Sequence, residues 1–266
     1  MRLKKVALLI FLILTTVSVL SQTDTVTDGV GTLKNWGISI IPLLAQKNKI
    51  QGEKSAYHLA SSPQTGMEVL INYFAGLGQR YSLIYSVGGG VMAHNFSFSI
   101  PKQLFDPPED VDIAYSKGFT RELDLLYFKA GVAVQRIFPA HSLSHWVALA
   151  GATIAYSPTT DAGTDYAIAR TDGSEQTYLS TDDNYNNHGK PWFNFHLDAG
   201  KEWRLNWGHL LQAMIRLNLS PTKFFSGMYT FKVGNQPPVS GKYSVSGTYI
   251  GINLSYVFSR YKKIKP

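Results

Sequence analysis

Residue types that hydrolytic enzymes use as nucleophile and base occur together in one short segment. The segment HSLSH (141–145) places His141 and His145 beside two serines. Acyl-hydrolysing sites require a base such as histidine within reach of the serine nucleophile. No acidic residue lies nearby in sequence to orient the histidine, so the segment is interpreted as a polar turn. We therefore expect no catalytic residue in this chain.

A second group of polar residues has the spacing of one strand face. His196, Asp198 and Glu202 lie at positions i, i+2 and i+6, so a β-strand would project all three to the same side. They could coordinate a metal ion or relay protons. The interpretation we favour is an internal network of charges that includes basic residues from other strands, with no metal and no cofactor. The predicted network consists of Glu68, Lys129, His196, Asp198, Glu202 and Arg216.

The elements that must position these residues are recognisable from the end of the chain, GTYIGINLSYVF (247–258). Apolar and polar residues alternate strictly along it, which predicts a β-strand with one apolar and one polar face. Seven earlier segments alternate in the same way, so eight strands are expected. The segment 227–234 also alternates, so ten strands remain an alternative to eight.

The connections between these segments alternate in length. Tight turns rich in Gly, Pro and Asn (GLGQ, PAHSL and LNWG) separate strands two and three, four and five, and six and seven. The other connections are long and cover roughly 46–64, 100–117, 158–190 and 221–242. This pattern predicts an all-β fold, an eight-stranded antiparallel up-and-down transmembrane β-barrel with short periplasmic turns and long external loops. The alternative is a soluble periplasmic β protein whose apolar faces form an internal core.

The side chains on the two faces favour the barrel. Aromatic residues lie on the apolar face near the strand ends, as in the girdles at membrane interfaces. Ionisable residues lie on the opposite face, where a barrel lumen can pair them and a soluble core cannot. Since eight strands enclose an interior just wide enough for side chains, we predict a plugged polar lumen.

The N-terminus predicts export from the cytoplasm. Residues 1–21 have a basic start, a short apolar run and small residues at the cleavage site, as a signal peptide does. Removing them lowers the net charge of +7 by three, and the mildly basic remainder does not indicate a nucleic-acid partner. The chain has no cysteine and therefore no disulfide framework. The predicted organisation is a signal peptide (1–21), a polar leader (22–34), the barrel (35–259) and a basic periplasmic tail (260–266).

Four segments carry a resemblance to known proteins: VLSQ, ELDLLYFKAGV, FNFHLDAGKEWRLNWG and YIGINLSYVF. With them, the mature chain resembles the small eight-stranded outer-membrane barrels with the OmpA-like fold, especially the "outer membrane protein beta-barrel" family of Bacteroidota-type bacteria. The resemblance implies the outer membrane of a Gram-negative bacterium, with its lipids and the barrel-assembly machinery as partners. Four residues of the last strand resemble the terminal signal that this machinery reads: Gly251, Leu254, Tyr256 and Phe258. The chain departs from that signal because eight residues follow the final aromatic residue.

The expected function is non-catalytic, because members of this family share a fold and not one activity. We expect a structural or binding protein whose external loops, chiefly 158–190, contact a ligand or a protein partner through Tyr166, Tyr178 and Tyr185. The alternatives are a narrow channel for small solutes, an accessory component of a secretion or surface-assembly system, and a lipid-modifying enzyme. Steady conductance would distinguish the channel from the binding protein.

Overall fold

The computed structural model covers the strands of the chain and leaves the terminal segments undescribed. It describes residues 35–52, 59–77, 80–93, 96–104, 113–115, 125–138, 144–158, 161–169, 175–185, 190–205 and 209–258. The predicted signal peptide, leader and basic tail lie outside these residues. Across these ranges, no helix has the length and apolar character needed to cross a membrane.

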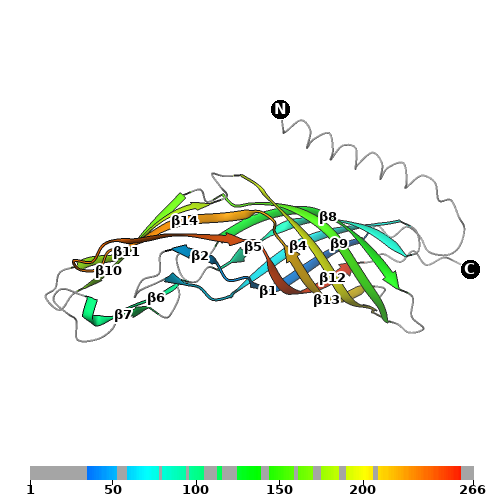
Figure 1. The fold of residues 1–266 in the computed structure, drawn as a ribbon. Coiled ribbons are helices and arrows are strands. Elements are labelled where there is room, and N and C mark those ends of the chain that lie inside the picture. The colour runs from blue at the N-terminus through cyan, green and yellow to red at the C-terminus, as the bar shows by residue number, and fades with distance from the viewer. Residues whose placement is uncertain are drawn as a thin grey trace, which may run out of the picture.

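Eight strands form a closed antiparallel barrel in the order β1-β16-β13-β12-β9-β8-β5-β4 (Figure 1). The first strand pairs with the last as well as with β4, so this barrel has no free edge. The predicted closed barrel of eight antiparallel strands is therefore confirmed, and the alternative of ten barrel strands is excluded. Their bounds are β1 (Asn35–Ala45), β4 (Gln64–Gly76), β5 (Tyr81–Met92), β8 (Leu125–Phe138), β9 (Ser144–Tyr156), β12 (Trp192–Arg204), β13 (Leu210–Leu219) and β16 (Tyr249–Phe258).

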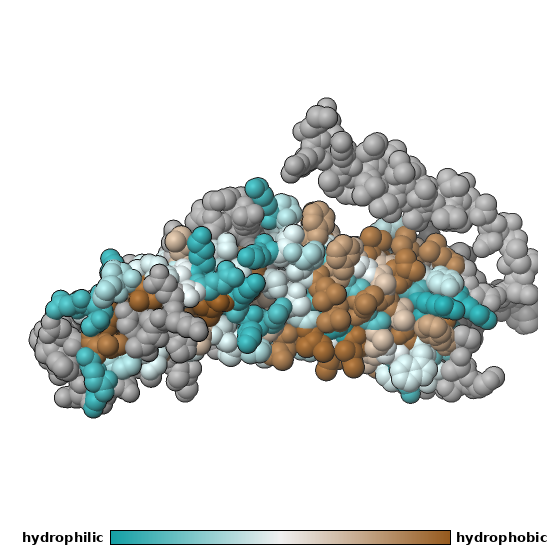
Figure 2. All heavy atoms as spheres, in the orientation of Figure 1, coloured by the Kyte–Doolittle hydropathy of each residue, from teal (hydrophilic) through white to brown (hydrophobic). Residues whose placement is uncertain are grey.

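Side chains that point out of the barrel are large, apolar and exposed. Ile215 in the middle of β13 is 64% exposed, and Trp36 and Trp146, at the end with the short turns, are each 58% exposed. Figure 2 shows a belt of hydrophobic residues around the barrel on the visible face. Water-soluble monomers rarely expose a continuous apolar surface of this kind, whereas membrane barrels place one against lipid.

The long connections contain strands of their own, which corrects the expectation of loops. One sheet of five strands has the order β10-β11-β14-β15-β2, and one of three has the order β3-β6-β7. We call these two sheets the extension, and they lie at the end of the barrel opposite the short turns (Figure 1). Their elements are β2 (Lys49–Gly52), β3 (Leu59–Ala60), β6 (Ser97–Ile100), the 3-10 helix η1 (Lys102–Leu104), β7 (Ile113–Tyr115), β10 (Asp161–Ala169), β11 (Glu175–Tyr185), β14 (Lys223–Phe231) and β15 (Val239–Ser246).

The extension forms because its strands bury apolar side chains between them. Phe225 and Phe231 of β14 are 1% and 0% exposed, and the Phe231 ring meets Phe98 of β6 edge-on at 5.6 Å. Tyr229 lies across Gly241 and Gly52, its register partners on β15 and β2, where a Cβ would overlap the tyrosine ring. A solvated loop has no such core; residues 227–231 of the alternating segment 227–234 belong to β14 of a packed sheet.

Candidate functional site: the lumen network

The polar faces of the barrel strands meet inside the barrel. Glu68, Lys129, Asp198 and Arg216 are all between 1% and 4% exposed. Charged residues are almost never this deeply buried unless they are paired. The arrangement of their partners therefore decides whether the lumen is a stable plug or a path for solutes.

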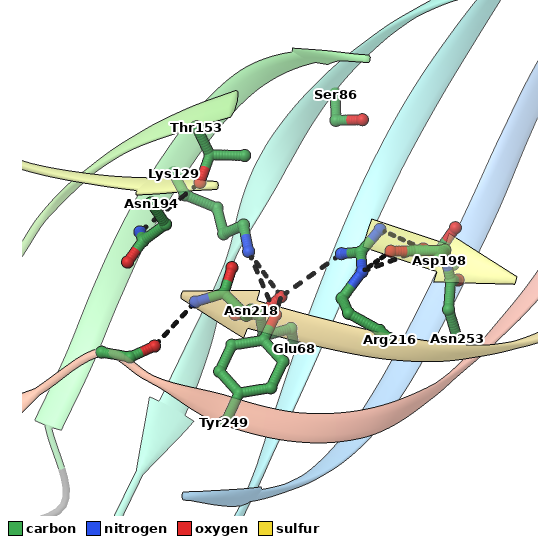
Figure 3. A network of polar contacts seen from close by, with 12 residues as sticks. Glu68, Ser86, Lys129, Thr153, Asn194, Asp198, Arg216, Asn218, Tyr249 and Asn253 are labelled. Atoms are coloured by element: carbon green, nitrogen blue, oxygen red, sulfur yellow. Dashed lines mark hydrogen bonds and ion pairs between the residues drawn. The ribbon is translucent and has the colours of Figure 1, made fainter. Parts of the chain in front are cut away.

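Glu68 is the centre of the part of the network that lies nearer to the extension. Lys129 donates to its Oε2 at 2.6 Å, Tyr127 donates to Oε1 at 2.6 Å, and Tyr249 donates to Oε2 at 2.8 Å. Figure 3 shows Lys129, Tyr249 and Arg216 converging on this carboxylate from three strands. A buried carboxylate with these partners keeps its charge compensated and its acceptor sites occupied.

A glycine makes this convergence possible. Glu68, Gly90 and Tyr127 are register partners across β4, β5 and β8. A Cβ on Gly90 would lie 2.8 Å from both Glu68 Cγ and the Tyr127 hydroxyl. The missing side chain at Gly90 therefore leaves the space in which Glu68 and Tyr127 form their hydrogen bond.

Arg216 and Asp198 form the second charged pair of the lumen. They face each other in register on β13 and β12, and Arg216 donates from Nε at 2.9 Å and from Nη2 at 2.8 Å. Asn253 of β16 also donates to Asp198 at 2.8 Å. Arg216 Nη1 lies 3.9 Å from Glu68 Oε2, which links the two pairs electrostatically. Two acids and two bases on four strands thus compensate one another.

Uncharged side chains extend the network toward the short turns. Ser255 donates to Asn253 at 2.9 Å and lies 2.6 Å from the Ser39 hydroxyl. Asn72 bonds Ser39 at 2.5 Å and accepts a hydrogen bond from Ser86 at 2.7 Å. A path of hydrogen bonds and ion pairs therefore runs from Lys129 on β8 across the lumen to Ser86 on β5, with the 3.9 Å contact between Arg216 and Glu68 as one of its links.

Two of the predicted network residues take other positions. Glu202 accepts a hydrogen bond from Gln212 at 2.7 Å, near the short turns. His196 packs against Gly151, its register partner on β9, and its Nδ1 is buried without a hydrogen-bond partner in the described structure. Within the described ranges, no three His, Asp or Glu side chains are grouped to hold a metal ion.

Sequence reasoning did not assign Tyr127, Tyr249 and Asn253 to the network, although all three make hydrogen bonds in it. Their signal is parity: Tyr127 shares the face of Lys129, and Tyr249 and Asn253 share the polar face of the last strand. An aromatic residue on the polar face of a barrel strand indicates a hydroxyl directed into the lumen.

Apolar side chains close the lumen on both sides of the polar network. Toward the short turns, Phe74, Ile84, Ala133, Leu149 and Val257 form a buried cluster. Toward the extension, the Tyr127 ring meets Trp192 edge-on at 5.9 Å within an apolar cluster that continues into the extension. The cavity between these layers has a volume of about 10 Å³, which is room for roughly one water molecule. Among the described residues, the polar network and these two apolar layers fill the barrel interior.

The residues expected at the other sites lie as follows. Leu254 and Phe258 face outward at 45% and 46% exposure, Tyr256 stacks on His209 at 5.5 Å, and Gly251 lies inside against β1. Tyr166 is placed on β10, and Tyr178 and Tyr185 on β11, in strands and not in loops. Of the segment HSLSH, residues 141–143 lie outside the described residues, and Ser144 and His145 begin β9 beside a short turn.

No family model matches the sequence, and no curated protein sequence matches it. The solved structures that are similar to the chain include outer membrane protein OprG from Pseudomonas aeruginosa, outer membrane protein AlkL in lipid bilayers, and Neisserial surface protein A. Their identities are 8%, 14% and 10%, and their TM-scores are 0.45, 0.39 and 0.33. The matches cover 86%, 92% and 82% of this chain and 98%, 99% and 96% of those chains. The fold assignment rests on the closed strand order of this chain alone.

Proposed function

We propose that this chain is an integral outer-membrane protein with a closed lumen, which holds the extension outside the cell as a non-catalytic binding surface. The observation that carries the proposal is that the lumen is filled with paired charges and apolar layers while the long connections build a folded unit. A barrel shaped for transport would need a water path, which eight strands rarely enclose.

The membrane location is supported by the belt of apolar side chains. Its residues are exposed at up to 64%, and in water this surface would drive aggregation. In lipid, the closed ladder satisfies the backbone and the belt contacts hydrocarbon. The signal peptide expected at residues 1–21 would deliver the chain, and Gly251, Leu254, Tyr256 and Phe258 would present β16 to the barrel-assembly machinery.

The position of β10 at the edge of the larger sheet, among the described strands, supports a protein partner at the extension. Strand β10 lies at one edge of the five-stranded sheet and carries Tyr166. An edge strand presents unpaired N–H and C=O groups to which an extended segment of a partner can add. Tyr178 and Tyr185 lie on the adjacent strand β11, so the three tyrosines belong to one margin of the sheet.

The closed lumen is tested by electrical recording. The refolded full chain, identified by a band that shifts on heating, should give no steady conductance in planar bilayers. Steady conductance whose ion selectivity changes in Lys129→Ala would contradict the plug and favour a solute channel.

The binding role is tested by cross-linking from the surface of living cells. A photoreactive residue at Tyr166, Tyr178 or Tyr185 should cross-link to a discrete protein, and one at Ile215 should not, because Ile215 faces lipid in this account. The absence of a protein cross-link from all three tyrosine positions would contradict a partner at the margin formed by β10 and β11.

A further inference from the structure

A hollow of about 420 Å³ lies on the outer face of the five-stranded sheet, across β2, β14 and β15. Three exposed lysines surround it, one from each strand, together with hydroxyl and amide side chains. Its charged and polar lining consists of Lys49, Lys223, Lys242, Gln51, Ser226 and Ser244. We call it the basic hollow.

The strand register explains why these residues share one face. Ser226, Ser244 and Lys49 are partners in one row across the sheet, and Lys242 and Gln51 are partners in the next row. The register shifts between Lys223 and Phe225, so Lys223 pairs with Ser246. This bulge turns Lys223 to the same face as Lys242, since Ser246 shares the parity of Lys242. Three positive charges are therefore directed to one concave surface.

The lysines of the basic hollow have no counter-charge in the described structure. No carboxylate lines the hollow, and among the described residues no ion pair or hydrogen bond engages Lys49, Lys223 or Lys242. Along the sheet, the nearest register position with an acid is Asp182, and Met228 lies between it and Lys242. The hollow thus has an uncompensated positive charge that suits an anion.

The basic hollow lies close to the edge of the hydrophobic belt. Lys223 follows the exposed Leu219 of β13 by four residues, and Lys49 follows the exposed Leu44 of β1 by five. On strands tilted as in membrane barrels, this separation is a height of roughly 10–13 Å. Lysine side chains can extend their ammonium groups back toward the membrane surface. Figure 2 shows hydrophilic residues directly beside the belt on the visible face.

We propose that the basic hollow binds the phosphate group of an outer-leaflet lipid headgroup. The acyl chains of this lipid would lie against the hydrophobic belt, while the three ammonium groups compensate the phosphate charge and Ser226, Ser244 and Gln51 donate hydrogen bonds. A lipid matches both the charge of the hollow and its position beside the belt, whereas a soluble anion matches only the charge. The inference rests on the outer-membrane location proposed above.

The test is native mass spectrometry of the refolded full chain in maltoside micelles. The probes are a diphosphorylated glucosamine disaccharide lipid, the same lipid without phosphate, and inorganic phosphate. The wild-type chain should retain the phosphorylated lipid in preference to the other two. Since a lysine near an anionic surface contributes roughly a fivefold change in affinity, Lys49→Gln/Lys242→Gln should weaken retention about thirtyfold.

A matched pair of lysines controls for total charge. Lys190→Gln/Lys232→Gln removes two exposed lysines outside the hollow and should leave lipid retention unchanged. Lys49→Arg/Lys242→Arg keeps the charge and should also retain the lipid. Equal losses in the two glutamine pairs, equal retention of the dephosphorylated lipid, or displacement by inorganic phosphate at the lipid's concentration would each overturn the proposal.

A heat-shifted band separates this proposal from the barrel assignment. If every variant gives the shifted band and the lipid is not retained, the lipid site is wrong and the barrel stands. If the wild-type chain gives no shifted band and requires no detergent, the outer-membrane location fails, and the lipid site fails with it.

Discussion

The barrel and the extension have opposite arrangements of polar and apolar residues. In the barrel, Ile215 is 64% exposed and Arg216 is 4% exposed; in the extension, Phe231 is buried and Lys242 is exposed. Both regions use the same alternation of side chains along antiparallel strands. The outer-membrane location proposed above explains the difference, because hydrocarbon favours an apolar exterior and water favours an apolar interior.

Two short transitions between the regions show how the chain reverses its faces. Between β13 and β14, the apolar residues keep odd positions, but Leu219 points outward and Phe225 inward. Between β15 and β16, odd-numbered residues point inward in both strands. The apolar residues change from odd positions in β15 (Tyr243 and Val245, buried) to even positions in β16 (Ile250 and Ile252, exposed). Between β13 and β14, an irregular segment of backbone changes the direction in which odd-numbered side chains point. Between β15 and β16, the alternation of apolar and polar residues shifts by one residue.

The largest predicted effect is the removal of the carboxylate at the centre of the lumen. Glu68→Ala leaves Lys129 and Arg216 as buried cations without Glu68, and breaking a buried pair costs about 3–5 kcal/mol. Urea unfolding in micelles, followed by tryptophan fluorescence, should show this loss of stability. Glu68→Met/Lys129→Met removes both charges and should be more stable than Glu68→Ala; a double variant as unstable as Glu68→Ala would contradict the charge pairing.

A core deletion in the extension should act locally. Phe231→Ala removes a ring that is 0% exposed, which costs about 3–5 kcal/mol in a packed core. Hydrogen exchange should increase in β14 and β15, while the heat-shifted band of the barrel stays unchanged. Met228→Ala, at a side chain 51% exposed on the same strand, is the control and should change neither measurement. Loss of the shifted band in Phe231→Ala would show that the two regions fold as one unit.

A charged residue introduced on the outer surface should show whether that surface faces lipid or water. Ile215→Arg places a cation at the middle of the belt, at a cost of about 2–4 kcal/mol. Met228→Arg makes the same change at an exposed position of the extension and should cost nothing measurable. The measurement is the fraction of chains that fold into lipid vesicles. Equal fractions for the two variants would contradict the assignment of the belt to lipid.

The smallest predicted effect compares two buried tyrosine hydroxyls. Tyr249→Phe removes a donor to Glu68 and should cost about 1.5–3 kcal/mol, because the acceptor is charged. Tyr243→Phe removes a buried hydroxyl that has no hydrogen-bond partner in the described structure, and it should be neutral or stabilising. Urea unfolding of both variants in the same micelles is the measurement. A larger loss of stability for Tyr243→Phe than for Tyr249→Phe would contradict this interpretation of the two hydroxyls.

Parity along the strands and the alternating lengths of the connections together predicted the barrel, and parity alone predicted its polar face. The faces of Glu68, Lys129, Asp198 and Arg216 follow from alternation, since a residue's side of a strand depends only on its position. The hydrogen-bond partners do not follow from it. Glu202 bonds Gln212 and not a base, because the register between β12 and β13 places these two opposite each other.

The extension was not predictable in the same way. Its strands alternate, but β11 pairs with β14 over a separation of about fifty residues, which no local pattern specifies. The bulge after Lys223 further shifts the parity of β14, so the face of that lysine cannot be obtained by counting residues. Long-range register and a single irregular position therefore limited the sequence prediction.

The measurement that tests the account most directly uses the absence of cysteine from the chain. Single variants Ile215→Cys and Met228→Cys are refolded into lipid vesicles and treated with a maleimide that does not enter membranes. The account predicts rapid labelling of Met228→Cys and labelling of Ile215→Cys only after unfolding. Equal labelling of both in intact vesicles would contradict it, because the belt would then face water and the reversal between the barrel and the extension would not exist.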